Sequence, residues 1–297
     1  LLAIDTRQAI HRAVKIETGM LKLVNEGKEF PLPKRVFVVG VGKCATAAAE
    51  ELEGILGDHL SGGLIIDVTK SNTCRLKKIE CFIGTHPFPS NENIAITTRL
   101  VELLTSLEAD DLVLMIVSGG GSTLLCLPEG NGTCLEEKMI VKTLFETGAT
   151  IQELNTVRKH MSLARGGHLA KVAYPAQVIG LIFSDVPGDD LTFVASGPTF
   201  LDKTTVADAD RVLEKYNILR TCGLDHCGLI ETPKEERYFE KVTNVLVVSN
   251  GLALEAMTEK ARSAGFSVEV VTKQLTGDAS AVGRALIASL RSAKVKT

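Results

Sequence analysis

The stretch Ser118-Gly119-Gly120-Gly121-Ser122 has the composition of a ligand-binding loop. It directly follows an uninterrupted apolar run, 112–117, which predicts a strand buried on both faces, as in parallel sheets covered by helices. Three glycines let the backbone turn its N–H groups into a concave nest, with no Cβ to hold a phosphate oxygen away. Open α/β sheets bind ligands in such loops, after the carboxyl ends of strands. The stretch is therefore a candidate phosphate-binding loop, and a turn that needs positive φ is the alternative.

Three aspartates, Asp185, Asp189 and Asp190, follow a second buried run at 178–183. Carboxylate oxygens are hard ligands that suit magnesium where it bridges phosphates. The same residues also occur as turn formers and helix caps. Because the carboxyl ends of parallel strands meet at one edge of a sheet, we expect Asp185 and Asp189 near the glycine-rich loop.

A third candidate loop contains Gly40, Gly42 and Lys43, between a predicted strand at 36–40 and a predicted helix at 46–56. The spacing Gly-x-Gly-x-x-Ala is close to a dinucleotide-binding fingerprint, with Asp67 as the candidate ribose acceptor. A lysine at a helix N-terminus is disfavoured by the helix dipole unless an anion lies between it and the helix amides. Lys43 is thus a candidate phosphate ligand, and a solvated loop lysine is the alternative.

Asn155, Arg158 and Lys159 follow i, i+3, i+4 spacing, which places them on one face of a predicted helix. The planar guanidinium of arginine suits a carboxylate or a phosphate, whereas a solvated basic face is the alternative. His86 lies in a proline-rich loop, where it is either an acid–base group or a local hydrogen-bonding residue. We expect the second role for it.

The elements that carry these loops predict an α/β fold. A Rossmann-like parallel sheet covered by helices is expected over residues 1–236, beginning with an amphipathic helix at 1–25. The polar, irregular composition of residues 216–237 is typical of a linker. After it, a strand at 242–248, a helix at 252–264, a strand at 266–271 and a helix at 278–291 predict the start of a truncated second α/β domain over 237–297.

Composition excludes several classes of protein. Of the 297 residues, 45% are hydrophobic, and the net charge of −3 provides no basic surface for nucleic acid. Seven cysteines without a C-x-x-C pair predict neither a disulfide framework nor a zinc site, and they suit a reducing compartment. No apolar run is long enough to span a bilayer. We expect a cytoplasmic protein, with a mitochondrial location left open because the chain begins at Leu1, after a removed targeting segment or inside its gene.

Taken in order, these motifs resemble the glycerate 2-kinases whose C-terminal half carries the MOFRL domain, a family also labelled hydroxypyruvate reductase. The resemblance covers roughly residues 35–200 and rests on Gly40-Val41-Gly42-Lys43, Thr85-His86-Pro87-Phe88-Pro89, Ser118-Gly119-Gly120-Gly121-Ser122, Asn155-Thr156-Val157-Arg158-Lys159-His160 with Gly166-Gly167-His168, and Ser184-Asp185-Val186-Pro187-Gly188-Asp189-Asp190 with Ser196-Gly197-Pro198-Thr199. Thr85 and His168 stand where the family has other residues. The glycine- and arginine-rich C-terminal segment of the family does not follow Thr297.

The resemblance implies transfer of the γ-phosphoryl group of ATP to the 2-hydroxyl of D-glycerate, with Mg²⁺. It assigns Lys43 to the phosphates in the transition state, and Asp185 and Asp189 to magnesium or to the attacking hydroxyl. Arg158 and Lys159 would hold the glycerate carboxylate or a phosphate. The remaining assignments are substrate binding by Asn155 and cofactor binding by Gly40, Gly42, Ser118, Gly119, Gly120, Gly121 and Ser122.

Two other functions remain open at this point. One is an NAD(P)H-dependent hydroxypyruvate reductase, which Gly40, Gly42 and Asp67 favour. The other is a truncated, non-catalytic form that exposes an apolar sheet edge and self-associates. The sequence does not decide which aspartate would act as general base, or which small hydroxy acid is the acceptor.

Overall fold

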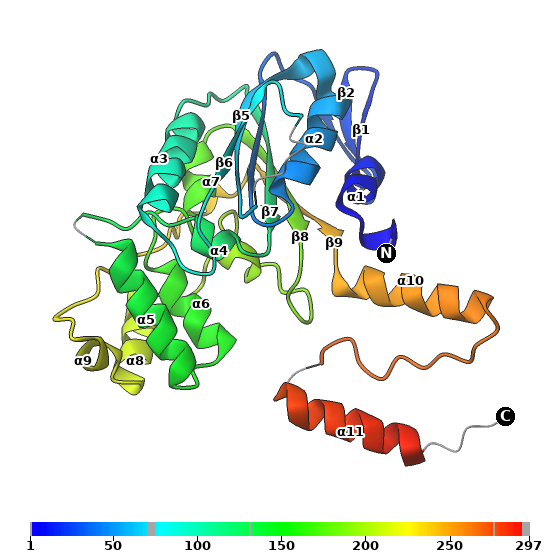
Figure 1. The fold of residues 1–297 in the computed structure, drawn as a ribbon. Coiled ribbons are helices and arrows are strands. Elements are labelled where there is room, and N and C mark those ends of the chain that lie inside the picture. Colours follow the sequence, from blue (N-terminus) through cyan, green and yellow to red (C-terminus); the bar gives the residue numbers. More distant parts are fainter. Residues whose placement is uncertain (1, 70–74, 131, 276, 293–297) are drawn as a thin grey trace.

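The computed structural model describes residues 2–69, 75–130, 132–275 and 277–292 of the chain. Its centre is a six-stranded sheet in which all neighbouring strands run parallel (Figure 1). The strands are β4 (Val36–Val41), β5 (Leu60–Asp67), β6 (Ile79–Ile83), β7 (Leu112–Ser118), β8 (Gln177–Phe183) and β9 (Val242–Val248).

The strand order is β6-β5-β4-β7-β8-β9. Along the chain the strands run outward from β4 to β6 and then return to β7 on the other side of β4, as in Rossmann sheets. The order therefore reverses between β4 and β7. The predicted parallel α/β sheet is confirmed.

Helices cover both faces of the sheet, as the apolar run of β7 predicted. Leu112, Leu114 and Ile116 pack into a core with α1 (Thr6–Ala13) and α2 (Ala45–Leu56). The alternate residues of the strand pack into a second core with α3 (Asn91–Thr105) and α7 (His168–Ala173). Every residue of β7 is buried, which explains why the run contains no polar alternation.

The N-terminal segment corrects one prediction. The helix expected through residue 25 ends at Ala13 and is followed by an antiparallel sheet of β1 (Val14–Glu17), β2 (Met20–Leu23) and β3 (Lys28–Pro31). Thr18 and Gly19 both have positive φ, 51° and 75°, as a two-residue hairpin turn requires. In these strands the buried apolar side chains Val14, Leu21 and Leu23 follow a period of two.

A group of helices lies beyond the carboxyl edge of the sheet (Figure 1). It comprises α5 (Cys134–Glu146), α6 (Ile151–Lys159), α8 (Val206–Lys215) and α9 (Ile218–Cys222), which share a separate apolar core. Capping boxes at Thr133, Thr150 and Thr205 start α5, α6 and α8. The cap at Thr150 fixes the start of α6, which carries three of the predicted site residues.

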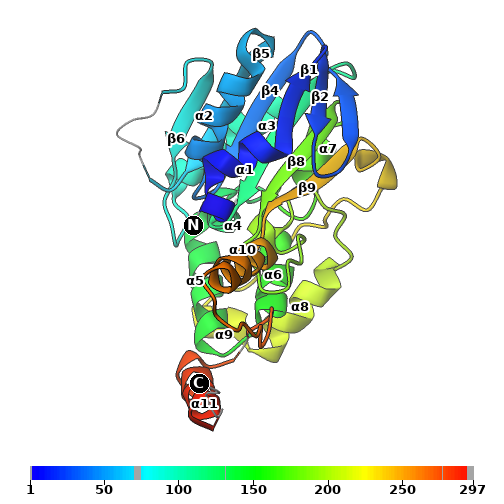
Figure 2. The same cartoon turned by 90° about the vertical axis from the view of Figure 1, so that its right-hand side faces the viewer.

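The C-terminal segment differs from its prediction in one element. The segment 266–271, expected as a strand, is irregular, and Phe266 and Val271 are 68% and 74% exposed. A strand needs a neighbour for its backbone hydrogen bonds, and among the described residues none pairs with this segment. The expected helices are present as α10 (Asn250–Ser263) and α11 (Ala279–Ser292), which both views show away from the sheet (Figures 1 and 2).

The division of the chain at residue 236 stays a prediction. β9 lies beyond that boundary, yet it is hydrogen-bonded to β8 along its length. The sheet thus continues past the predicted linker. None of the described helices has the length and apolar composition needed to cross a membrane.

Candidate active site

The loops after β4 and β7 meet at the point where the strand order reverses. The Lys43 amide donates to the Gly119 carbonyl at 3.0 Å, and the Cys44 amide lies 3.4 Å from Ser118 Oγ. Ser118 is itself buried and donates to the Val41 carbonyl. The two candidate loops are therefore held together by backbone amides of one loop that donate to the other.

Gly40 and Gly42 have packing roles. A Cβ on Gly40 would lie 3.0 Å from the Ile65 side chain and 3.2 Å from that of Ile116, and one on Gly42 would overlap Ser118 Oγ. The absence of a Cβ at these two positions lets β4 and β7 approach closely. The cofactor contacts predicted for Gly40 and Gly42 stay predictions, because the described structure uses both for packing.

The carboxylate of Asp67, the candidate ribose acceptor, already accepts hydrogen bonds from other residues of the protein. It is buried, and its Oδ2 accepts from the amide of Thr46 at 3.0 Å and from the Thr46 hydroxyl at 2.7 Å. Its Oδ1 accepts from the Val68 amide at 2.7 Å. The carboxylate thus caps the N-terminus of α2, where the helix dipole favours a negative charge, and a ribose would have to compete with these bonds.

The loop from Gly119 to Ser122 presents free backbone donors. Among the described residues, no acceptor is seen for the four amide N–H groups of positions 119–122. Gly120 has φ of 87°, and a Cβ on Gly121 would lie 2.6 Å from Ala195 Cβ, so both positions require glycine. Gly119 and Gly120 are partly exposed. A loop with these properties can cradle an anion.

Lys43 and His86 both lie against Gly120. A Cβ on Gly120 would be 3.3 Å from Lys43 Cγ, 3.4 Å from Lys43 Cε and 3.5 Å from His86 Cδ2. Lys43 is exposed, and among the described residues its ammonium has no hydrogen bond or ion pair. A free cation thus lies against the loop whose amides are also free.

Arg158 brings a second free cation to this region. It is half-buried, and its Nε is buried without a partner in the described part of the chain. Burial lowers the pKa of Arg158 to about 10, and the charge of Arg165 adds to that shift. Partial burial lowers the pKa of His86, and the charges of Lys43 and Arg158 lower it further. Both cations therefore act on the imidazole of His86.

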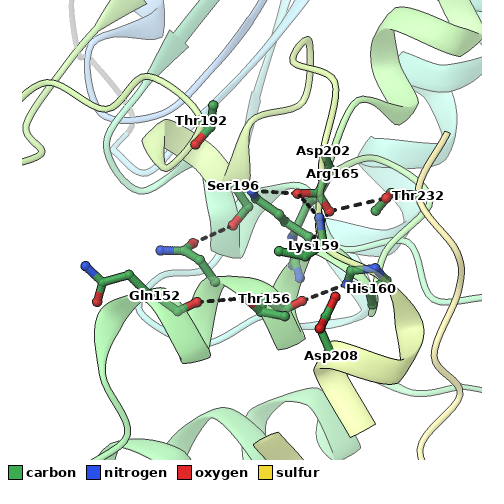
Figure 3. A network of polar contacts seen from close by, with 12 residues as sticks. Gln152, Thr156, Lys159, His160, Arg165, Thr192, Ser196, Asp202, Asp208 and Thr232 are labelled. Atoms are coloured by element: carbon green, nitrogen blue, oxygen red, sulfur yellow. Dashed lines mark hydrogen bonds and ion pairs between the residues drawn. The ribbon is translucent and has the colours of Figure 1, made fainter. Parts of the chain in front are cut away.

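The other two α6 residues have internal partners. Lys159 Nζ lies 3.0 Å from Asp202 Oδ1, and both side chains are buried (Figure 3). Asn155 Oδ1 accepts from Ser196 Oγ at 3.1 Å. The same Ser196 Oγ lies 2.9 Å from Ser122 Oγ. These bonds tie α6 to the glycine-rich loop. The substrate contacts predicted for Asn155 and Lys159 stay predictions, and the structure gives both residues a positioning role.

A buried ion pair beneath Arg158 was missed by the sequence analysis. Arg165 is fully buried, its Nη2 lies 2.8 Å from Glu137 Oε1, and its Nη1 donates to the Arg158 carbonyl at 3.1 Å. Arg165 therefore fixes the end of α6 that presents Arg158. No local pattern marks it, since an arginine before two glycines resembles a loop residue and Glu137 is 28 residues away.

The two aspartates differ in their surroundings. Asp185 is exposed and lies against Gly119, where a Cβ would overlap its Oδ2. Asp189 has φ of 54° and lies beside Gly251 at the start of α10, and its Oδ1 is buried without a partner in the described chain. A buried carboxylate oxygen without a hydrogen bond and a carboxylate at an anion loop fit the oxygen donors that magnesium requires.

The contact between Gly119 and Asp185 gives a prediction. In a Gly119→Ala variant the new methyl group displaces the Asp185 carboxylate, which can move because it is exposed. We expect the magnesium concentration for half-maximal activity to rise by about tenfold, with little change in the urea midpoint. Gly54→Ala, on α2 with open space around it, is the matched control. An unchanged magnesium dependence in Gly119→Ala would contradict the role of Asp185.

A cavity of about 820 Å³ lies elsewhere, between α2 and the segment 75–78. Its carboxylates are occupied: Arg7 forms ion pairs with Glu50 and Glu51, and the Arg75 amide donates to Glu50 at 2.9 Å. None of the residues predicted from the sequence to bind a ligand lines this cavity. The loops at the carboxyl edge remain the candidate active site.

Comparison with known proteins gives the following matches. A family model described as "Domain of unknown function (DUF4147)" matches residues 1–225. A Pyrococcus horikoshii protein named glycerate 2-kinase is 37% identical over 293 residues, which are 95% of this chain and 64% of that protein. A Thermotoga maritima protein named D-glycerate 2-kinase is 36% identical over 270 residues, 89% of this chain and 64% of that protein.

Two further proteins are similar to this chain. An Agrobacterium vitis protein that carries the name hydroxypyruvate reductase is 35% identical over 305 residues, 99% of this chain and 67% of that protein. The crystal structure of glycerate kinase from Thermotoga maritima superposes with a TM-score of 0.81 at 31% identity, covering 99% of this chain and 67% of that one. The chain thus spans about two thirds of the length of these relatives.

Proposed function

This chain belongs to the family described as DUF4147, and we propose that it is a glycerate 2-kinase, which transfers the γ-phosphoryl group of ATP to the 2-hydroxyl of D-glycerate. One observation carries the proposal. The free amides of Gly119–Ser122 and the free ammonium of Lys43 lie together at the switch point of a parallel sheet. Such a site suits a phosphate chain.

In this proposal each group has a role that follows from its position. The amides of Gly119–Ser122 bind phosphate oxygens, and Lys43 neutralises charge on the γ-phosphoryl group as it moves. Arg158 holds the carboxylate of glycerate, because its guanidinium is free and its planar donors match two carboxylate oxygens. Asn155 and Lys159 keep α6 in place through Ser196 and Asp202. Catalysis then consists mostly of positioning and charge neutralisation.

Magnesium would be held by Asp185 and Asp189, whose carboxylates are described above. When bound, the ion would supply positive charge that offsets the negative charge of the phosphates. Without it, Asp185 would repel a phosphate at Gly119, since both are negative. The protein is therefore expected to bind ATP together with the metal, and poorly without it.

The alternative functions have less support from the geometry. A nicotinamide-dependent hydroxypyruvate reductase would use Asp67, whose carboxylate is occupied by Thr46 and Val68. A non-catalytic form would self-associate through exposed apolar side chains, of which Met257 and Phe266 are examples at 67% and 68% exposure. Light scattering that shows a monomer would exclude self-association.

The test is an assay of the 297-residue chain with ATP, Mg²⁺ and D-glycerate, with the product identified as 2- or 3-phosphoglycerate. We expect the 2-isomer. A parallel reaction with NADH and hydroxypyruvate, without ATP or Mg²⁺, tests the reductase. NADH oxidation there, with no phosphoglycerate in the first reaction, would overturn the proposed function.

A further inference from the structure

The imidazole of His86 lies against the glycine-rich loop that is proposed to hold the phosphates, and within electrostatic range of Arg158. Its Cδ2 lies 3.5 Å from the position of a Cβ on Gly120, on the side of the loop that also carries Lys43. The charges of Lys43 and of Arg158 both act on it. Among the described residues neither ring nitrogen has a hydrogen-bond partner. An acid–base side chain without a partner thus lies at the site.

The chemistry of a 2-hydroxy acid explains why this place matters. Its carboxylate and its hydroxyl are on adjacent carbon atoms, so a carboxylate held by Arg158 brings the hydroxyl near Arg158 as well. The phosphoryl group that the hydroxyl attacks lies at the glycine-rich loop. A group that accepts the hydroxyl proton must therefore lie near the glycine-rich loop and close enough to Arg158 to be affected by its charge. His86 meets both conditions.

The protonation state of His86 suits this role. Partial burial of the ring lowers its pKa, and the charges of Lys43, in the loop after β4, and Arg158, on α6, lower it further. An imidazole with a pKa below its usual value is neutral at pH 7 and can accept a proton. The alternative acceptors are Asp185, which lies against Gly119, and Asp189, whose Oδ1 is buried without a partner in the described chain. Both carboxylates are the oxygen donors that fit the metal.

We propose that His86 is the general base of the reaction, an inference that rests on the proposed function. The proton of the 2-hydroxyl moves to a ring nitrogen of His86, and a bond forms between that oxygen and the γ-phosphorus. The bond from the γ-phosphorus to the bridging oxygen breaks, and ADP leaves with that electron pair. The proton is later released to water.

The experiment compares the 297-residue chain with His86→Gln and His86→Ala variants. His86→Gln should lower kcat by about 10²- to 10³-fold, because glutamine cannot accept a proton at neutral pH. The KM for D-glycerate should change by less than about threefold, since Arg158 remains. The fall of kcat toward acid pH, due to protonation of His86, should disappear. Free imidazole should restore activity to His86→Ala and leave His86→Gln unchanged.

The matched control is His59→Gln, an exposed histidine at the amino end of β5 in the 3-10 turn η2 (Gly57–His59), which should behave as the wild type. A second measurement does not depend on turnover. The ring resonance of His86, assigned by its loss in His86→Gln, should shift when D-glycerate is added with a non-hydrolysable ATP analogue and Mg²⁺.

The outcomes distinguish a failure of the role of His86 from a failure of the proposed kinase function. A wild type that forms 2-phosphoglycerate while His86→Gln keeps its kcat and its pH profile would overturn the role of His86 and leave the kinase standing. A wild type without turnover would overturn the proposed function, and an unshifted His86 resonance would then also remove His86 from any hydroxy-acid site.

Discussion

Replacing Lys43 by alanine should lower kcat for glycerate phosphorylation by about 10³-fold. The ammonium lies beside Gly120, against a stretch of four consecutive amides for which no acceptor is seen among the described residues. Negative charge on the γ-phosphoryl group must be compensated as it moves, and water cannot replace a fixed cation there without reorganising. Since Lys43 has no ion pair in the described chain, its removal should leave the urea midpoint unchanged.

A Lys43→Met variant separates charge from packing. Methionine keeps an unbranched stem against Gly120, where Lys43 Cγ and Cε now lie, but it carries no charge. We expect it to be as inactive as the alanine variant. Lys28→Ala, on the exposed strand β3, is the control for loss of a lysine elsewhere. A Lys43→Met enzyme within threefold of the wild-type kcat would contradict the role of the charge.

The second large effect is on stability. Arg165→Met should lower the free energy of unfolding by about 3–5 kcal/mol, because it leaves the buried Glu137 carboxylate without its cation. Cys126 Sγ donates to the same carboxyl group at 3.3 Å and cannot replace a charged partner. Urea denaturation followed by circular dichroism measures the loss.

The double variant Arg165→Met with Glu137→Met distinguishes an unpaired charge from a packing defect. If the cost comes from the unpaired carboxylate, the double variant should be more stable than Arg165→Met alone, since replacing both members of a buried pair by apolar groups is often nearly neutral. It should still weaken glycerate binding, because the Arg158 carbonyl loses the bond from Arg165 Nη1. A double variant as unstable as the single one would show that packing is responsible.

The sequence by itself determined the parallel sheet and the loops that carry the site. The runs of β7 and β8 lack polar alternation, and such runs occur where a strand is covered on both faces. The predicted loops lie at one edge because parallel strands place their carboxyl ends together. Local patterns failed at the hairpin of residues 14–23, where short apolar segments suggested a helix but pair as strands. They also failed at segment 266–271, which pairs with no strand in the described part of the chain.

Only the tertiary structure decided which candidate residues are free to act. Arg158 and Lys159 are adjacent on α6, and one residue of a helix turns a side chain by about 100°. That turn directs Lys159 to Asp202, which is 43 residues away in the chain, and leaves Arg158 without an ion pair in the described structure. Asp67 and Lys43 differ in the same respect. The carboxylate of Asp67 is occupied at the N-terminus of α2, whereas the ammonium of Lys43 has no partner in the described structure. Residue type is local, but a charge is satisfied or free according to what the fold brings next to it.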